Sequence, residues 1–168
     1  ADALYSGILV DTDNFVVKAG VRTFEAAAYL RRAGADVTRV RKMFREDMEN
    51  CKIRADIINR AELFYDEFAI STFDGRNVDG ATVIGAKAAN ALLDVQGIRG
   101  SFVITEISSC IYVSARSIDD LNVQIIMEKF GGGGHLTVAA AQLKDKPMDE
   151  VVNDLKNLLA SMKKEGDI

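Results

Sequence analysis

The sequence predicts an α/β fold for most of the chain. Two β-rich runs, residues 102–107 and 111–115, are separated by Ser108-Ser109, a spacing typical of a hairpin. From residue 148 onward, apolar residues recur three or four positions apart, which is typical of an amphipathic helix. From about Leu63 the order is strand, helix, strand, strand, helix, turn, strand, helix, and it predicts one compact α/β domain.

Composition narrows the class of protein. The 168 residues, 48% hydrophobic and 27% charged, are typical of a soluble globular chain with one core, or one domain and a piece of another. No apolar run approaches the roughly 18 residues of a membrane span, and we expect no signal peptide in the opening residues. The net charge of −4 argues against coating long nucleic acid, which requires a basic face, but allows a small phosphorylated ligand.

The N-terminal segment leaves two alternatives open. Residues 4–10 are an apolar run that fits a strand or a buried helix end equally well. Asp11 follows this run, at a position suited to a metal ligand or a catalytic carboxylate. A turn or a helix cap explains the same aspartate equally well. Residues 16–19 are expected to be short and extended.

Two helices are expected next. Thr23 is predicted as the N-cap of a helix whose apolar face runs up to Gly34. Asp36 or Thr38 is predicted to cap a longer helix that connects two domains. The apolar positions of that longer helix are Val40, Phe44, Met48, Cys51, Ala55 and Ile58.

The α/β part begins with a predicted strand at residues 68–73 and a helix of small residues at 81–93. The hairpin follows, and its second strand ends in Arg116-Ser117, which presents an arginine at a strand end. Asp119 or Asp120 is predicted to start the next helix, which runs to about residue 130.

A glycine turn follows that helix and is the main candidate for a binding site. Gly131, Gly132, Gly133 and Gly134 precede His135, the only histidine of the sequence. Bare main-chain amides beside an imidazole suit an anion, and phosphate fits best. A flexible linker is the alternative, but linkers are usually longer and polar, whereas this turn lies between apolar residues. The P-loop and dinucleotide-binding patterns do not fit its spacing.

The C-terminal part is predicted to be structural. Residues 139–144 are expected to form a further strand, and Pro147 opens the last helix. The apolar stripe of that helix indicates core packing and not a cofactor site.

Taken together, these segments resemble the DHH-family phosphoesterases. Residues 7–15, Gly-Ile-Leu-Val-Asp-Thr-Asp-Asn-Phe, look like the last metal-binding motif of their catalytic domain. Residues 20–27 and 34–36 look like the segment that closes that domain. The resemblance covers essentially the whole chain, and the combination of motifs is what makes it specific.

The second half resembles the DHH-associated substrate-binding domain through residues 113–117, 122–123 and 131–135. Two segments are most similar to the membrane-anchored cyclic di-AMP phosphodiesterases. They are Thr-Phe-Glu-Ala-Ala from residue 23 and Gly-Gly-Gly-Gly-His-Leu from residue 131. In the wider family two residues and then Ala-Ala-Gly follow the histidine. Here three residues intervene and Ala141 replaces the glycine, which favours the cyclic-dinucleotide branch over the oligoribonuclease branch.

The resemblance implies a division of the chain. Residues 1–60 are expected to be the helical C-terminal end of a DHH catalytic domain with its connecting helix. Residues 61–168 are expected to be a compact α/β DHH-associated substrate-binding domain with a mixed sheet.

The resemblance also implies the chemistry: cleavage of cyclic di-AMP to linear di-adenylate at two manganese ions, with a metal-bound hydroxide as nucleophile. Asp11 is implied as a metal ligand, and Arg116 offers a planar fork to phosphate oxygens. The implied substrate-binding residues are Ser114, Arg116, Ser117, Asn122, Gly131, Gly132, Gly133, Gly134 and His135. Arg22 and Thr23 are further candidates, although a helix start with an exposed arginine explains them at least as well.

The motifs that are missing matter as well. A two-metal site requires several carboxylates and histidines, whereas this chain has one histidine and no Asp-His-His motif. We therefore expect the C-terminal portion of a longer enzyme, which binds nucleotide weakly and hydrolyses nothing alone. The expected parent protein is anchored in the cell membrane, with this portion in the cytoplasm and in no contact with the membrane. A homodimer is a further expectation.

Two alternative functions stay open. The first is an oligoribonuclease or 3′-phosphoadenosine phosphatase of the same family. The second is a non-catalytic RNA-binding module, since relatives of this domain are appended to alanyl-tRNA synthetases. The acidic net charge of −4 counts against that second alternative.

Overall fold

A computed structural model describes residues 1–118 and 120–168 of the chain. These residues divide into two compact units, residues 1–47 and residues 48–168. The expected boundary between the end of a catalytic domain and a substrate-binding domain, at residues 60 and 61, rests on the family resemblance and stays a prediction.

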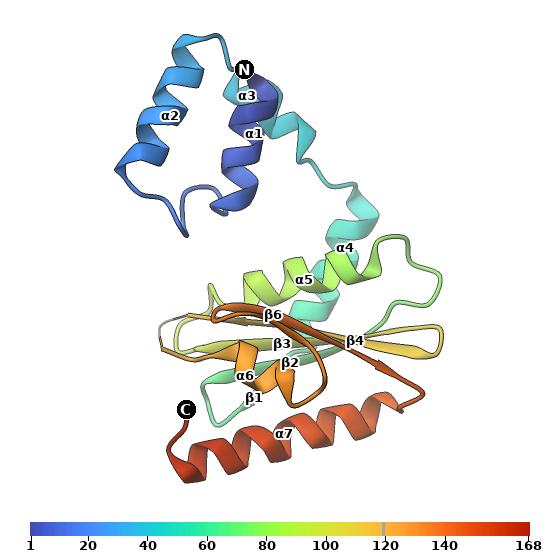
Figure 1. Ribbon diagram of the computed structural model, residues 1–168. Helices are drawn as coiled ribbons and strands as arrows, with labels where there is room; N and C mark the ends of the chain where they lie inside the picture. The colour runs from blue at the N-terminus through green and yellow to red at the C-terminus, as the bar shows by residue number, and fades with distance from the viewer. Residues whose placement is uncertain (119) are drawn as a thin grey trace. The chain divides into compact units, whose positions relative to one another are not determined.

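The first unit is a group of three helices: α1 (Asp2–Asp11), α2 (Val21–Arg32) and α3 (Val37–Met43) (Figure 1). Residues 4–10 are therefore helical and not a strand, but this helix is not the buried helix end that was the other alternative, because Leu4 and Val10 are exposed and Tyr5 is the buried residue of the run. Asp36 caps α3 as predicted, because its carboxylate accepts hydrogen bonds from the amides of Thr38, at 2.7 Å, and Arg39, at 3.1 Å. The small core of this unit consists of Tyr5, Ala27, Leu30, Ala35 and Val40.

Two expectations for this unit are wrong. The N-cap of α2 is Gly20 and not Thr23, which is already inside the helix. Residues 16–19 are not extended, because the chain turns tightly after α1, with left-handed φ angles at Asp13 (44°) and Lys18 (53°). The Thr12 hydroxyl holds this turn by accepting a hydrogen bond from the Phe15 amide at 3.0 Å.

The predicted long helix is interrupted. α3 ends at Met43, and α4 (Met48–Asn59) begins only after a short irregular segment. Phe44 and Met48, two of its predicted apolar positions, are 45% and 70% exposed. They therefore do not continue a single buried stripe.

The second unit is built on a six-stranded mixed sheet with the strand order β1-β2-β3-β4-β6-β5 (Figure 1). β2 and β3 are parallel, and all other neighbouring strands are antiparallel. The strands are β1 (Glu62–Phe64), β2 (Phe68–Asp74), β3 (Gly100–Ile107), β4 (Cys110–Ser117), β5 (Gly133–His135) and β6 (Val138–Lys144). The predicted α/β class with a mixed sheet is confirmed.

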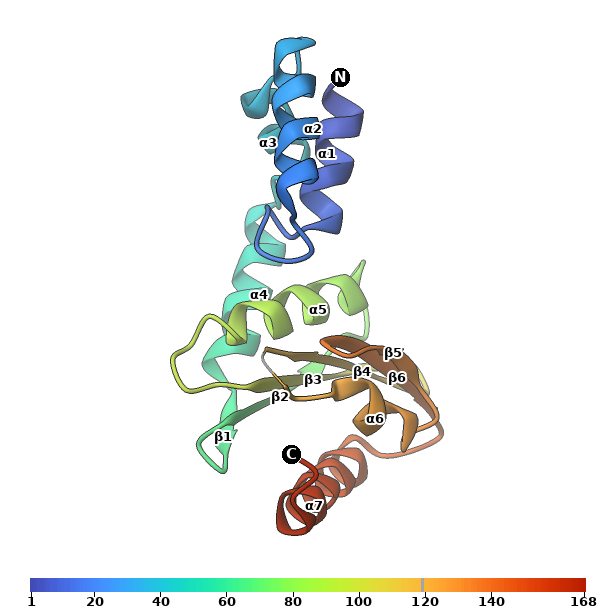
Figure 2. The ribbon, with the colours of Figure 1, turned by 60° about the vertical axis from the view of Figure 1, so that its left-hand side comes forward.

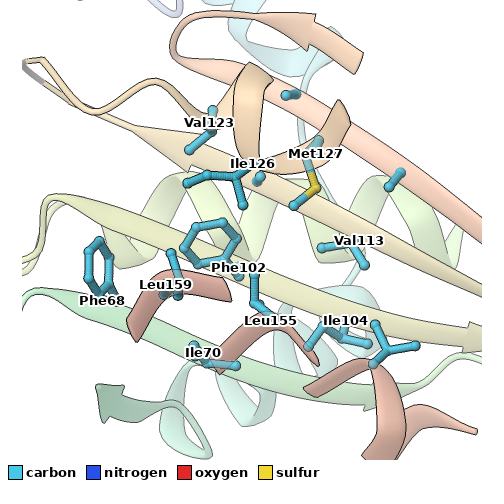
Figure 3. Close-up of a cluster of buried hydrophobic side chains, with 14 of the residues drawn as sticks. Phe68, Ile70, Phe102, Ile104, Val113, Val123, Ile126, Met127, Leu155 and Leu159 are labelled. Carbon is cyan, nitrogen blue, oxygen red and sulfur yellow. The ribbon is translucent and has the colours of Figure 1, made fainter. Parts of the chain in front are cut away.

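Helices cover both faces of the sheet (Figure 2). α4 and α5 (Ala81–Leu92) pack on one face, where Ile57, Ala88 and Val103 are part of a buried cluster. α6 (Val123–Glu128) and α7 (Met148–Glu165) pack on the other. There the larger core joins Phe68 and Phe102 of the sheet to Leu155 and Leu159 of α7 (Figure 3).

A cluster of charges that the sequence did not predict ties the end of α7 to the sheet. Glu67 accepts hydrogen bonds from Arg99 Nη1, at 2.9 Å, and from Lys163 Nζ. The Lys163 ammonium also lies 5.5 Å from the centroid of the Tyr65 ring. Partial burial alone raises the pKa of the Glu67 carboxyl, but the hydrogen bonds and charges of Lys163 and Arg99 outweigh it, and the pKa lies below its usual range.

The lowered pKa of Glu67 predicts a pH-dependent contribution to stability. The contribution is complete above the ordinary glutamate pKa of about 4.3 and disappears as the pH falls through the lower pKa of the folded state. We expect Glu67→Gln to reduce the free energy of unfolding by about 0.5–1 kcal/mol at neutral pH and by much less in strong acid. Urea unfolding at pH 7 and pH 3 measures this difference. An equal effect of the substitution at both pH values would contradict the assignment.

Candidate functional site

The register of the sheet brings Arg116 and His135 to the same face. Arg116 on β4 is paired with Val138 on β6, and Val138 is paired with His135 on β5. Directly paired residues of antiparallel strands project their side chains to the same face. The two side chains, far apart in the sequence, therefore start about 10 Å apart, which is twice the spacing of neighbouring strands.

A second row of small residues lies next to this one. Ser114 on β4 is paired with Ala140 on β6, and Ala140 is paired with Gly133 on β5. Since side chains alternate along a strand, this row is on the same face as Arg116. Ala140 and His135 are exposed and Ser114 is half-buried. Four predicted site residues (Ser114, Arg116, Gly133 and His135) are thus brought together on an accessible face, here called the polar sheet face.

Arg116 is held by at least two hydrogen bonds. Its Nε donates to Oδ1 of Asn90 on α5 at 2.7 Å, and its Nη1 donates to the Ala115 carbonyl at 2.9 Å. Asn90 was missed by sequence reasoning. The only signal was a polar residue in a helix of small apolar ones, and most such residues simply face solvent.

Two other predicted residues are engaged in the fold. Ser117 is buried, and its hydroxyl donates to the Leu121 carbonyl at 2.6 Å. The Asn122 side chain caps α6 by accepting hydrogen bonds from the amides of Gln124, at 3.0 Å, and Ile125, at 3.4 Å. Asn122 therefore has the capping role predicted for Asp119 or Asp120, of which Asp119 lies outside the described residues. The predicted contacts of Ser117 and Asn122 with substrate stay predictions.

The first two glycines end α6. Gly131 has a φ of 72°, and its amide donates to the Glu128 carbonyl at 3.0 Å. The Gly132 amide donates to the Met127 carbonyl at 2.9 Å, which completes a Schellman-type helix end. These two amides are already used, and Gly133 and Gly134 belong to β5, which is paired with β6, so the four glycines do not form the predicted cradle of four bare amides.

Packing explains two of the four glycines. A Cβ at Gly132 would lie 2.1 Å from the Ala140 carbonyl oxygen, and a Cβ at Gly134 would lie 2.4 Å from that of Val138. Both glycines are therefore required by the close approach to β6. A Cβ at Gly133 would meet no atom within 4 Å, and the φ of Gly133 is not positive. Neither packing nor backbone conformation explains glycine at this position. The remaining explanation is that a side chain here would occupy space that a ligand uses.

His135 ends β5 with an exposed side chain. We expect His135→Ala to leave the free energy of unfolding within about 0.5 kcal/mol of the original protein, as at most exposed positions. We also expect it to weaken nucleotide binding. Thermal unfolding and a binding titration of the same variant check both statements. A collapse of the melting temperature would show that the imidazole supports the fold instead.

A second groove lies on the opposite face of the sheet, against α7. Its lining includes two cations, Lys129 and Lys146. Lys146, however, is paired with Glu150, at 2.7 Å, and with Asp154, at 3.1 Å. The charge of Lys146 is therefore largely compensated, which counts against this groove as an anion site.

The first unit contains the remaining predicted residues. Asp11 is the last residue of α1, and Arg22 is near the start of α2, both exposed, while Thr23 is half-buried. Within the described residues, no three His, Cys, Asp or Glu side chains are grouped so that they could hold a metal ion. A two-metal centre requires more ligands than Asp11 supplies. The described residues therefore do not fit two manganese ions by themselves, and Asp11 as a ligand stays a prediction.

Among the described helices, none combines the length and the apolar composition that crossing a bilayer requires.

Comparison with known proteins gives a consistent result. Residues 68–165 match the DHHA1 domain. The chain is 46% identical to the cyclic-di-AMP phosphodiesterase PdeA of Listeria monocytogenes. The aligned residues make up 92% of this chain and 24% of that protein. It is 44% identical to the cyclic-di-AMP phosphodiesterase GdpP of Geobacillus thermodenitrificans, over 95% of this chain and 24% of that protein. The chain thus spans about a quarter of the length of these relatives.

The fold has a counterpart among solved structures. An exopolyphosphatase-related protein from Bacteroides fragilis superposes with a TM-score of 0.86, over 97% of this chain and 50% of that one. The sequence identity is 18%, so this likeness concerns the fold alone.

Proposed function

The chain belongs to the DHHA1 domain family, and from this premise we propose that it is the substrate-binding portion of a longer cyclic di-AMP phosphodiesterase. In this proposal, residues 61–168 bind the cyclic dinucleotide. The first unit is the end of a DHH catalytic domain, to which Asp11 contributes a ligand for manganese. The parent enzyme converts cyclic di-AMP to linear di-adenylate, and this portion of it lies in the cytoplasm beneath a membrane anchor.

The observation that carries the proposal is the polar sheet face. Arg116 and His135 lie in one row of paired residues, and Gly133 lies open in the next row. A guanidinium forms two parallel hydrogen bonds with phosphate oxygens. A bare main-chain segment next to it lets a phosphate approach the backbone. The relatives that are 46% and 44% identical over the aligned residues are named cyclic-di-AMP phosphodiesterases, and a cyclic dinucleotide contains two phosphate groups.

The surface of the first unit supports a place in a larger domain. Many of its large apolar side chains are exposed, for example Val16 (78%) and Val21 (76%). Patches of exposed apolar side chains usually mark surfaces that another structure covers. The exposed set in this unit is Leu4, Val10, Val16, Val17, Val21, Phe24, Tyr29, Val37, Met43 and Phe44.

The proposal assigns binding to this chain and hydrolysis to the longer protein. Within the chain, Arg116 binds and orients a phosphodiester, the backbone without side chains at Gly133 and Gly134 accommodates it, and His135 borders it. The described residues do not gather the ligands of a two-metal centre. We therefore expect no turnover by the 168 residues alone, even with added manganese.

Isothermal titration calorimetry of the purified chain tests the proposal with two probes, cyclic di-AMP and linear di-adenylate. We expect weak but saturable binding of both, and a hydrolysis assay with manganese should show no product. The absence of binding at millimolar nucleotide would contradict the assignment of a substrate-binding portion. Manganese-dependent hydrolysis would contradict the separation of binding from catalysis.

A further inference from the structure

We propose that Asn90 on α5 is a further residue of the ligand site: it positions the guanidinium of Arg116 and donates a hydrogen bond to the same phosphate group. The part of this inference that concerns the ligand rests on the proposed function. The part that concerns Arg116 does not, because it can be tested without any nucleotide.

The positioning role follows from two of the hydrogen bonds that Arg116 makes. Nε donates to Asn90 Oδ1 at 2.7 Å, and Nη1 donates to the Ala115 carbonyl at 2.9 Å. Two anchors on different nitrogens fix the orientation of a planar group as well as its position. A flexible arginine side chain is then already ordered before a phosphate binds, which reduces the entropy lost on binding.

The donor role follows from the orientation of the Asn90 amide. A guanidinium can only donate hydrogen bonds, so the side-chain oxygen of Asn90 must face Nε. The NH2 group of Asn90 must then face away from Nε, and Asn90 is exposed. Because Oδ1 of the same amide group contacts the guanidinium, the two N–H donors of Asn90 lie close to the group that would receive the anion.

The helix gives this side chain a rigid base. The neighbouring residues Ala88 and Ala89 are completely buried in the interface of α5 with the sheet. In addition, the buried Ser101 hydroxyl on β3 donates to the Ala89 carbonyl at 2.6 Å. A residue on a packed helix holds its geometry better than a residue on a loop, as a positioning role requires.

Two substitutions separate positioning from ligand contact. Asn90→Ala removes both the acceptor for Arg116 and the donor for the phosphate. Asn90→Asp keeps an acceptor for Nε but removes the NH2 donor and adds a negative charge beside the anion. Asn153→Ala, at an exposed asparagine on α7 across the sheet, is the matched control.

The first measurement uses the chain without ligand. In 1H–15N spectra at low temperature, we expect a protected Nε–H signal that is lost in Arg116→Lys and so belongs to Arg116. It should also be lost in Asn90→Ala, and it should persist in Asn90→Asp and Asn153→Ala. An Nε–H signal that is unchanged in Asn90→Ala would overturn the positioning role, whether or not the chain binds nucleotide.

The second measurement is a calorimetric titration of the same variants with linear di-adenylate. We expect about tenfold weaker binding for Asn90→Ala, the loss of one useful hydrogen bond. Asn90→Asp should bind still more weakly although its Arg116 signal persists, and Asn153→Ala should bind like the original chain. Unchanged affinity in Asn90→Asp would overturn the ligand contact. If the original chain and all variants failed to bind, the proposed function and the ligand contact would fall together, and the spectra alone would decide the positioning role.

Discussion

Arg116→Ala is expected to weaken binding of cyclic di-AMP by about 30- to 150-fold, which corresponds to the 2–3 kcal/mol of a charged hydrogen-bond partner. The guanidinium is the cation that the sheet register places on the polar sheet face next to His135 and Gly133. It is half-buried and anchored by Asn90, so solvent screens it less than a fully exposed arginine. In the full-length enzyme the same substitution should lower kcat/KM by a similar factor.

Two further variants make the Arg116 result specific. Arg116→Lys keeps the charge but loses the planar fork, and we expect an affinity between those of the original chain and Arg116→Ala. Arg76→Ala removes an exposed arginine at the end of β2, where it is paired with Asp74 at 2.7 Å, and should leave binding unchanged. A loss of less than threefold for Arg116→Ala, or an equal loss for Arg76→Ala, would show that Arg116 does not contact the phosphate.

Gly132→Ala is expected to destabilise the second unit by about 2–3 kcal/mol, the upper range for overpacking. The added Cβ would lie 2.1 Å from the Ala140 carbonyl oxygen and 2.7 Å from the Ala141 Cβ. The first of these atoms belongs to the backbone of β6, so it cannot move aside without disturbing the pairing of β5 with β6. Urea unfolding measures this loss of stability.

Gly133→Ala is the matched control for that prediction. A Cβ at Gly133 meets no atom within 4 Å, so the unfolding transition should stay close to that of the original chain. Nucleotide binding should nevertheless weaken, because the methyl group would occupy the open space beside Ala140. Equal unfolding transitions for Gly132→Ala and Gly133→Ala would contradict the packing explanation. Unchanged binding by Gly133→Ala would contradict the ligand explanation.

The parts of the fold that could be predicted are those with a local signature. The alternation of buried and half-buried residues in β4 and the helical spacing of Val151, Leu155, Leu159 and Met162 in α7 are visible in the sequence. Asp36 as a helix cap is also a local signal, and it is confirmed.

The parts that could not be predicted depend on partners distant in the sequence. β1 and β5 are only three residues long and are defined by their neighbours β2 and β6. The break between α3 and α4 was hidden because Phe44 and Met48 keep a helical spacing although both are exposed. A period identifies a candidate apolar face, but it does not show whether another element covers that face.

The candidate site was predictable residue by residue but not in its arrangement. Arg116, Gly133 and His135 were identified from the sequence, whereas their shared face follows from the register of three strands. The use of the Gly131 and Gly132 amides to end α6 could not be seen, because four identical residues carry no sign of their separate roles. Asn90 was missed because its role depends on its contact with Arg116, which is distant in the sequence.

A 1H–15N titration of the chain with linear di-adenylate tests directly whether the nucleotide binds on the polar sheet face. We expect the largest shifts at the amides of Gly133, Gly134 and His135 and at the Nε–H of Arg116. Shifts confined to Lys129, Lys146 and their neighbours in the groove against α7 would place the nucleotide on the opposite face of the sheet and contradict the account.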